Sequence, residues 1–505
     1  MGGADATLGH RMRDGDLPAF SATVRKKVVI VGAGIAGLSA ARALALAGEQ
    51  DFVLLDLEPE VGGNSRSGKN ERARFPLGAH YLPIPDPSDQ QLVEFLKEAG
   101  VCTGVGDDGL PTYNEEHVCG HPHERLFHLG VWRAGLVPKV GLSIDELEQF
   151  ERFDSYLQKC ADAKDEQGRY AFAVPVEGMS FAEELKEFRD LDKLSFGAWM
   201  EGQGYTCDAI RWYMDYCCLD DYGAPAGTVS AYAGLHYFAA RRGRAGNAEA
   251  GAVLTWPEGN AFLANALAKH AVDHFESGRL AHTLTLTETA VELDVFDAAK
   301  SITMRYLAEQ VILCVPQFVA ARILGDLNAQ RTKDLHYAPW VVVNLTLDAY
   351  PEERGGEPMA WDNVRYGSGT LGYVNSAHQQ LDRVPGPIIT HYRALTASTP
   401  EEARRIAYER TKEDWVNDAI EELRVVHPDI DERVIQANVA LWGHGMVVPV
   451  PGLITSDTRR ALALPIADRI HFAHSDLSGI SIFEEAFHHG LRAAKEVLQQ
   501  MPPKT

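Results

Sequence analysis

The chain has 505 residues, of which 45% are hydrophobic and 24% are charged, and its formal net charge at pH 7 is −23. This balance is typical of a folded globular protein, and the length exceeds one ordinary hydrophobic core, so two domains are expected. The negative charge argues against a nucleic-acid partner, because little basic charge is left to neutralise phosphate. An acidic field attracts a cationic substrate, or simply keeps the protein in solution.

The cysteine pattern and the apolar runs exclude two further classes. The seven cysteines are odd in number and show no CxxC spacing, so we expect neither a disulfide framework nor a metal site. No run of about 18 uncharged apolar residues exists, so no transmembrane segment is expected. The first residues lack the apolar stretch of a signal peptide. A cytoplasmic location is the default expectation, and an exported protein remains the alternative if a leader was removed.

A strand, a glycine-rich turn and a helix follow an N-terminal arm that we expect to be extended over residues 1–23. Residues 28–31 are continuously apolar, which is typical of a strand buried on both faces of a parallel sheet. An Ala- and Leu-rich helix is predicted as far as Gly48, and a second apolar run covers residues 52–55. The pattern predicts a βαβ unit.

The turn of this unit carries the motif GxGxxG, formed by Gly32, Gly34 and Gly37. The first glycine allows the tight turn, the second lets the backbone approach a pyrophosphate, and the third permits close packing of helix and strand. The helix N-terminus then presents unpaired N–H groups to the phosphates. Asp56 lies 19 residues after Gly37, where a carboxylate accepts hydrogen bonds from ribose hydroxyls. These features predict dinucleotide binding; a purely structural glycine turn is the alternative.

The remaining chain divides into regions that differ in composition and in predicted secondary structure. Charged amphipathic helices and aromatic-rich pieces fill residues 86–249, including helices predicted within 143–163 and 180–191. From about residue 250 an α/β pattern returns. Strands are predicted within 289–316 and 338–348, one long amphipathic helix over 400–428, and a last helix from about Ser481.

The segments around the glycine motif resemble the flavin amine oxidase superfamily, which includes monoamine and polyamine oxidases, protoporphyrinogen oxidase and carotenoid desaturases. Gly62 and Gly63 match its GG-R-S/T segment, although Asn64 stands where Arg is more usual and Arg66 follows two positions later. Four further stretches are similar to the family: FPLGAHYLP (75–83), WPEGNAFLANALA (256–268), QVILCVP (310–316) and the segment beginning RIHFAHSDLSG (469–479). The match is weak over residues 86–249 and 350–437, where substrate is selected.

The resemblance implies an α/β fold with a Rossmann-like FAD-binding domain and an α+β substrate domain. We assign residues 24–85, 250–330 and 438–505 to the FAD-binding domain, and residues 86–249 and 331–437 to the substrate domain. The FAD is expected to be noncovalent, because no cysteine lies beside His444. Motifs and resemblance together assign the following residues to FAD: Gly32, Gly34, Ile35, Ala36, Gly37, Asp56, Leu57, Gly62, Gly63, Asn64, Ser65, Arg66, Gly78, Ala79, His80, Val291, His474, Ser475, Asp476, Ser481, Ile482 and Phe483.

The start of the last helix provides a physical reason for flavin chemistry. Its N-terminus, near Ser481–Phe483, is expected to point at the isoalloxazine ring, where a helix dipole stabilises the negative charge left by hydride arrival. This expectation requires the glycine-rich turn near the start of the chain and the helix near its end to lie around one flavin.

The resemblance further implies hydride transfer from a carbon next to nitrogen to flavin N5, giving an imine that water hydrolyses to an aldehyde. The catalytic candidates are His80, Tyr81, Trp442, His444 and Asn344. Asn344 stands where family oxidases often place a lysine near the flavin, so electrons go either to oxygen or to another acceptor. The candidates for binding the substrate, a small molecule and in our prediction a cationic amine, are Asp220, Asp221, Tyr222 and Phe483.

Each candidate also has an ordinary structural interpretation: loop packing for His80 and Tyr81, and a helix cap or solvated acid pair for Asp220 and Asp221. Three other functions stay open at this point. They are a desaturase- or protoporphyrinogen-oxidase-like enzyme that oxidises a C–C bond, a flavin-binding protein without catalysis, and an NAD-only dehydrogenase.

Overall fold

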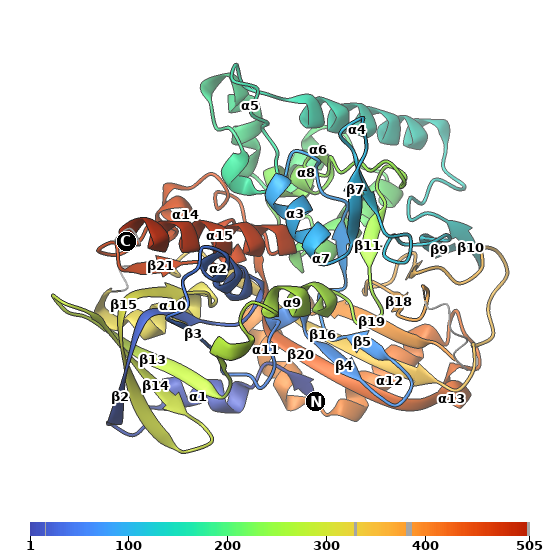
Figure 1. Cartoon of the computed structure of the whole chain (residues 1–505). Coiled ribbons are helices and arrows are strands. Elements are labelled where there is room, and N and C mark those ends of the chain that lie inside the picture. The colour runs from blue at the N-terminus through green and yellow to red at the C-terminus, as the bar shows by residue number, and fades with distance from the viewer. Residues whose placement is uncertain (16, 328–330, 380–385, 502–505) are drawn as a thin grey trace. The chain divides into compact units, whose positions relative to one another are not determined.

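The computed structural model describes residues 1–15, 17–327, 331–379 and 386–501 (Figure 1). The chain forms two compact units, each assembled from separated segments. Unit 1 comprises Met1–Gly3, Ser67–Ala261 and His336–Thr455; unit 2 comprises Ala4–Arg66, Phe262–Leu335 and Ser456–Thr505. Both contain sheets with helices packed on them, and the α/β, two-domain fold class expected from the sequence is confirmed.

Unit 2 is built on a seven-stranded sheet with the order β12-β3-β2-β15-β14-β13, in which β21 also pairs with β15. Its strands are β2 (Phe20–Val31), β3 (Phe52–Leu55), β12 (Phe275–Glu276), β13 (Arg279–Leu286), β14 (Val291–Asp297), β15 (Ile302–Leu313) and β21 (Ile470–Phe472). The pairs around β2 are parallel, whereas β13, β14 and β15 are antiparallel. The apolar run at residues 28–31 is buried at the centre of the parallel part, as predicted.

Two helices from opposite ends of the sequence pack together in unit 2. Helix α2 (Ile35–Leu46) follows the glycine-rich turn, and α15 (Phe483–Gln500) is the last helix. At their crossing Gly490 lies against α2, where an added Cβ would stand 2.2 Å from the carbonyl oxygen of Ala36. The expectation that the first and last FAD segments lie together therefore holds for these two helices. The remaining helices of unit 2 are α1 (Ala6–Asp14), α10 (Gln317–Leu324) and α14 (Asp457–Leu462), and α9 (Ala261–Ala268) begins at the last residue of a unit 1 segment.

The N-terminal segment differs from the extended arm expected over residues 1–23. Residues Ala6–Asp14 form helix α1, because the Asp5 carboxylate accepts a hydrogen bond from the Leu8 N–H at 2.9 Å and Gly15 ends the helix in the left-handed region. Strand β2 already begins at Phe20, which pairs with Thr303 of β15. Only the short strand β1 (Gly2–Gly3) belongs to unit 1.

Unit 1 contains an eight-stranded sheet with the order β1-β20-β16-β19-β18-β17-β9-β10. Its longer strands are β9 (Glu124–His128), β10 (Val131–Ala134), β16 (His336–Leu347), β17 (Asp362–Arg365), β18 (Tyr373–Asn375), β19 (Ile388–Ala394) and β20 (Val434–Val448). One face packs on helices α11 (Pro400–Glu409) and α12 (Lys412–Leu423) through a cluster that includes Val341, Val343 and Leu345. Because side chains alternate along a strand, Val342 and Asn344 of β16 point to the opposite face.

The single helix expected over residues 400–428 is two helices, α11 (Pro400–Glu409) and α12 (Lys412–Leu423). The break falls at Thr411, whose hydroxyl accepts from the Asp414 N–H while the Asp414 carboxylate accepts from the Thr411 N–H. This capping box starts a new helix inside a continuous amphipathic pattern, which periodicity alone does not reveal.

The rest of unit 1 is mostly helical. Its helices are α3 (Gln90–Glu98), α4 (Ile144–Asp162), α5 (Lys186–Arg189), α6 (Phe196–Gly202), α7 (Asp208–Tyr222), α8 (Ala231–Ala239) and α13 (Ile430–Arg433). Three two-stranded pairs join β4 (Ser67–Lys69) to β5 (Arg74–Pro76), β6 (Tyr81–Pro83) to β11 (Val253–Thr255), and β7 (Cys102–Val105) to β8 (Pro111–Tyr113). The helix predicted within 143–163 is α4. The one predicted within 180–191 is reduced to the short α5 between 3₁₀ turns.

All seven cysteines are buried free thiols. Among the helices that the structure describes, none is both long and apolar enough to cross a membrane. Within the same described ranges no group of three or more His, Cys, Asp or Glu side chains is arranged to hold a metal ion.

The crossing of α2 and α15 yields a first prediction. We expect Gly490→Ala to lower the free energy of unfolding by about 1–3 kcal/mol, because the new methyl group meets the α2 backbone. Thermal or urea unfolding measures the effect, and loss of bound flavin is expected to accompany it. Gly202→Ala, at the end of α6 with open space around the added carbon, is the matched control and should leave stability unchanged or raise it by up to about 1 kcal/mol.

Candidate functional site

The glycine-rich turn of unit 2 has the geometry of an anion-binding loop. Gly32 adopts a φ of 101°, and an added Cβ on Gly37 would stand 1.8 Å from the Gly32 carbonyl oxygen, so the turn and the helix start are in direct contact. Gly34 is the N-cap of α2 without any side-chain cap, and a Cβ there would meet nothing within 4 Å. The uncapped helix start beside open space suits a pyrophosphate.

The second glycine pair closes onto this turn. Gly62 and Gly63 have φ values of 115° and 56°, and an added Cβ on Gly63 would lie 3.3 Å from the Gly34 Cα. The Gly62 N–H donates to the Ala33 carbonyl at 2.8 Å. Arg66 donates from Nη1 to the Glu58 carboxylate at 2.9 Å and from Nε to the Gly63 carbonyl at 3.2 Å. Residues 62–66, assigned to the cofactor from sequence, are thus brought to the glycine-rich turn.

Asp56 lies at the end of β3, as the dinucleotide motif requires. Its carboxylate accepts from the Ala33 N–H at 2.5 Å and from the Glu58 N–H at 2.8 Å. Burial raises the pKa of this carboxyl group, while the two N–H donors act in the opposite direction. Asp56 therefore joins the glycine-rich turn to the loop that carries Leu57.

The C-terminal candidates also lie in unit 2. Asp476 is buried in the 3₁₀ turn Ser475–Leu477, where it accepts from the Gln317 N–H at 2.8 Å and lies 3.0 Å from His474 Nδ1. Helix α15 begins at Phe483, two residues after the expected Ser481, and the Phe483 ring stacks on Phe487 with centroids 6.2 Å apart. Ile482 is the N-cap of this helix and makes no side-chain cap hydrogen bond of its own.

The remaining cofactor candidates are divided between the units. Ile35 and Ala36 form the first turn of α2 in unit 2, and Val291 is the buried first residue of β14. Gly78, Ala79 and His80 belong to unit 1. The glycine cradle, the uncapped start of α2 and Asp56 fit the pyrophosphate and ribose of FAD, and they are the residues of unit 2 that would hold them.

Unit 1 fixes the segment that carries His80 and Tyr81 through its backbone carbonyls. Three side chains on neighbouring strands of the sheet donate to three consecutive carbonyls: Asn344 of β16 to Pro76 at 3.1 Å, Trp442 of β20 to Leu77 at 2.6 Å, and Tyr392 of β19 to Gly78 at 3.0 Å. Asn344 is fully buried, and its amide oxygen also accepts from the Thr390 hydroxyl at 2.7 Å.

The next three carbonyls accept from residues around strand β11. The Asn260 N–H donates to Ala79 at 3.1 Å, the Thr255 hydroxyl to His80 at 3.3 Å, and the Asn260 side-chain amide to Tyr81 at 2.9 Å. Every carbonyl from Pro76 to Tyr81 therefore has a donor from elsewhere in unit 1. We refer to residues 76–81 as the clamped segment.

The clamped segment presents two aromatic side chains to others in unit 1. The imidazole of His80 stacks on Tyr392 with ring centroids 4.5 Å apart and lies 5.5 Å from Trp361. Tyr81 contacts Trp361 edge-on at 5.9 Å. Burial lowers the pKa of His80 to about 3, so this imidazole is neutral at physiological pH.

Carboxylates of helix α7 meet these rings. The Tyr81 hydroxyl donates to Asp220 at 3.1 Å, and Arg241 Nη2 pairs with Asp221 at 2.7 Å and reaches the Tyr81 hydroxyl at 3.4 Å. Asp221 is thus neutralised by Arg241. Burial and the neighbouring Asp221 raise the pKa of Asp220 to about 7, although Arg241 and Tyr81 oppose the rise.

Sequence reasoning missed Asp362, which accepts a hydrogen bond from the Tyr216 hydroxyl at 3.2 Å. Tyr216 lies one helical turn before Asp220 on α7, and Asp362 begins β17 beside Glu124 of β9. Burial raises the pKa of Asp362 strongly, and the nearby Glu124 and Asp220 raise it further. The dipeptide Trp361–Asp362, an aromatic beside an acid, was the available sequence signal, but nothing in the linear pattern linked it to α7.

The other candidates have structural partners. Tyr222 is fully buried and donates from its hydroxyl to the Ala233 carbonyl at 2.7 Å. His444 is exposed on β20, and its ring contacts Tyr337 edge-on at 5.7 Å. The structure thus brings His80, Tyr81, Asp220 and Asp221 into one cluster. It places Asn344 and Trp442 beneath the clamped segment and gives Tyr222 and His444 other partners.

Comparison with known proteins identifies the family of this chain. The family model described as flavin containing amine oxidoreductase matches residues 35–498. Tryptophan 2-monooxygenase of Pseudomonas savastanoi is 38% identical over 131 residues, which are 25% of this chain and 22% of that protein. The match thus spans about a fifth of the length of that curated relative.

Solved structures share the fold at low identity. A variant of putrescine oxidase is 17% identical with a TM-score of 0.70, covering 95% of this chain and 100% of that one. Cyclohexylamine oxidase from Brevibacterium oxydans IH-35A is 15% identical with a TM-score of 0.66, covering 94% and 99%. A fatty acid isomerase from P. acnes is 14% identical with a TM-score of 0.62, covering 93% and 98%.

The clamped segment yields a second prediction. Trp442→Phe removes the donor to the Leu77 carbonyl, and we expect it to cost about 1–3 kcal/mol of stability and to slow substrate oxidation, because His80 loses its fixed support. Urea unfolding and stopped-flow reduction measure the two effects. Trp415→Phe is the matched control, since the buried Trp415 indole N–H has no hydrogen-bond partner among the described residues. Equal effects of both variants on the oxidation rate would contradict this assignment.

Proposed function

The chain belongs to the family of flavin-containing amine oxidoreductases, and we propose that it oxidises an amine, either a polyamine or a simple primary amine. It is an FAD-dependent oxidoreductase. The observation that carries the amine assignment is the cluster of Asp220 and Asp362 with the rings of His80, Tyr81 and Trp361 in unit 1.

The charge balance of the cluster favours a cationic ligand. Arg241 pairs with Asp221, whereas Asp220 accepts from the neutral hydroxyl of Tyr81, and Asp362 accepts from the neutral hydroxyl of Tyr216 and the Asn363 N–H. Both aspartates keep some solvent-accessible surface. Removing carboxylates from water is costly unless a cation pairs with them. An ammonium group supplies that cation, and the surrounding aromatic faces attract it further.

The proposed reaction removes two electrons and two protons from the C–N unit of the amine. The resulting imine takes up water and yields an aldehyde and ammonia, or a shorter amine. Bound FAD supplies the two-electron acceptor for the hydride. The neutral His80 and the rings of Tyr81, Trp361 and Tyr392 orient the amine and exclude water, and Asp220 and Asp362 hold its positive charge.

We propose that the FAD is bound noncovalently. The seven cysteines are buried free thiols, and the sequence places none beside His444. The Gly32–Gly37 turn and the Gly62–Arg66 loop support binding through the backbone instead. Acid precipitation is expected to release all flavin into the supernatant; yellow colour that stays with the denatured protein would contradict this.

A further proposal concerns the electron acceptor, and it rests on the side chain of Asn344. Its amide donates to the Pro76 carbonyl and accepts from Thr390, so it contributes no positive charge where family oxidases often place a lysine. We infer a slow reaction with oxygen and a preference for another electron acceptor.

Oxidation of a purely apolar C–C bond is disfavoured, because the carboxylates would then face an apolar ligand without a partner.

A third prediction tests the amine assignment. Anaerobic addition of spermidine, spermine, 1,4-diaminobutane or n-butylamine to the purified protein is expected to bleach the flavin absorbance with at least one of these amines. Reoxidation by air is expected to be slower than by an artificial quinone acceptor. If the whole panel leaves the flavin oxidised, the amine assignment fails while the FAD assignment stands.

A fourth prediction concerns pH. The ammonium group binds the ionised form of Asp220, so kcat/KM is expected to rise as pH increases through about 7, where this carboxyl group loses its proton. Asp220→Asn should raise KM for the amine at least about tenfold and flatten this part of the pH profile. Asp208→Asn, an exposed acid in the first turn of the same helix, is the control and should keep both. An unchanged profile in Asp220→Asn would dismiss this residue.

A further inference from the structure

Strands β9 and β17 form a parallel pair, with acidic side chains on one face and a basic and an amide side chain on the other. Their register places Asp362 beside Glu124 and Asn363 beside Arg125. Because side chains alternate, the two carboxylates share one face, and Arg125 and Asn363 share the other. Neighbouring like charges weaken a strand pair, so an attractive interaction on the opposite face helps to hold the pair in register.

Arg125 supplies that interaction. Its side chain is fully buried, and its Nε donates to Asn363 Oδ1 at 2.6 Å across the strand pair. The guanidinium also donates to the Glu357 carbonyl at 2.8 Å, the Glu353 carboxylate at 2.5 Å and the Tyr373 hydroxyl at 3.0 Å. Such a rigid planar fork fixes several partners at once, which a lysine does not do.

Asn363 links Arg125 to the backbone of Trp361, the residue whose ring contacts the cluster. Its side-chain amide donates to the carbonyls of Ala360 at 2.9 Å and Trp361 at 3.3 Å, and its oxygen also accepts from the Ala360 N–H at 3.1 Å. The Trp361 carbonyl accepts a second hydrogen bond from the Asn375 N–H at 2.9 Å. The backbone before Asp362 is thus held from the side occupied by Arg125.

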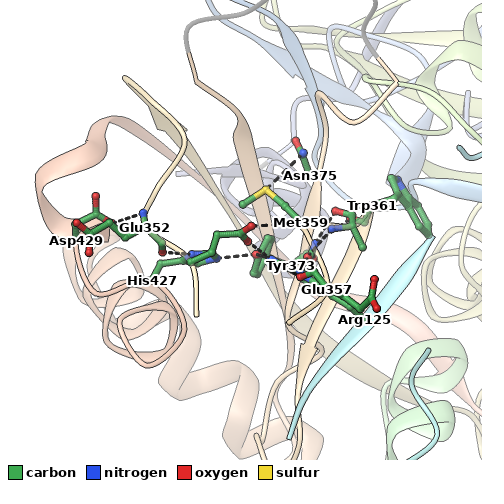
Figure 2. A network of polar contacts seen from close by, with 12 residues as sticks. Arg125, Glu352, Glu357, Met359, Trp361, Tyr373, Asn375, His427 and Asp429 are labelled. Atoms are coloured by element: carbon green, nitrogen blue, oxygen red, sulfur yellow. Dashed lines mark hydrogen bonds and ion pairs between the residues drawn. The ribbon is translucent and has the colours of Figure 1, made fainter. Parts of the chain in front are cut away.

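The network extends away from the site through Tyr373. Figure 2 shows Arg125, Tyr373 and His427 connected in sequence, with Glu352 beyond them. The Tyr373 hydroxyl lies 2.6 Å from His427 Nε2, and His427 Nδ1 lies 2.9 Å from the Glu352 carbonyl. This outer part of the network provides an internal comparison, because it shares Arg125 but does not bond to Trp361.

We propose that Arg125 is a positioning residue for substrate selectivity: through Asn363 it holds β17 in the register that keeps the Trp361 ring against His80 and Tyr81 and the Asp362 carboxylate beside Tyr216. The inference rests on the proposed amine oxidation. It assigns Asp362 to a second positive charge of the substrate, so that a diamine is preferred over a monoamine of the same length.

The test is the ratio of kcat/KM for 1,4-diaminobutane to that for n-butylamine, measured on the flavin-loaded enzyme. Asp362→Asn is expected to lower this ratio about tenfold or more, mainly by raising KM for the diamine. Arg125→Lys, which loses the fork, and Asn363→Ala, which loses its acceptor, should each lower the ratio about fivefold or more. Two independent variants keep the test decisive if one of them fails to fold.

Tyr373→Phe separates positioning from general destabilisation. It removes the hydroxyl shared by Arg125 and His427 and is expected to lower the melting temperature, yet it leaves the Arg125–Asn363 bond and should keep the ratio within about twofold. An unchanged ratio in Asp362→Asn, or an equal loss in Tyr373→Phe and Arg125→Lys, overturns the inference while amine oxidation by the wild type stands. A wild type that oxidises no amine instead defeats the proposed function, and the inference with it.

Discussion

The clamped segment is the constraint on which the candidate site of unit 1 depends. A backbone stretch without helix or strand hydrogen bonds is normally mobile, because its carbonyls lack partners. Here each carbonyl from Pro76 to Tyr81 accepts from a residue outside the segment, on the β16–β20 sheet or around β11. His80 therefore has a backbone held as firmly as that of Tyr81, the first residue of strand β6. This rigidity matters for an oxidoreductase, since small displacements of an orienting group cost rate.

The same principle of fixed partners explains why the acids of the cluster differ. Asp221 pairs with a guanidinium at 2.7 Å, whereas Asp220 accepts from the phenol of Tyr81, and Asp362 accepts from the phenol of Tyr216 and from the Asn363 N–H. Burial raises the pKa of all three carboxyl groups, and Arg241 opposes the rise at Asp221 both through its charge and through its hydrogen bond. Burying these carboxylates costs free energy, and binding of a cationic ligand reduces that cost. Perturbed carboxyl groups of this kind gather at functional sites because binding restores their charge balance.

The sequence predicted the glycine-rich turn of unit 2 better than the cluster of unit 1, for a physical reason. Gly32, Gly34, Gly37 and Asp56 act through backbone geometry over a short span, so their spacing alone predicts the turn. The residues around His80 come from α7, β17, β19 and β20, and only the folded sheet brings them together. Asp362 and Arg125 were missed for this reason. The helix break at Thr411 was missed because a local capping box overrode a continuous amphipathic pattern.

Asn344 stands where related oxidases often have a lysine, and it has a different structural role. Compared with the lysine expected there, a buried asparagine has a neutral amide that both donates and accepts, and here it does both, to Pro76 and from Thr390. A lysine at this fully buried position would offer only donors and a charge that needs a partner, and the Thr390 hydroxyl would lose its acceptor. One side chain therefore cannot both support the clamped segment through a neutral amide and provide a positive charge. The altered chemistry that we infer for the electron acceptor and the rigidity of the clamped segment are two consequences of one residue.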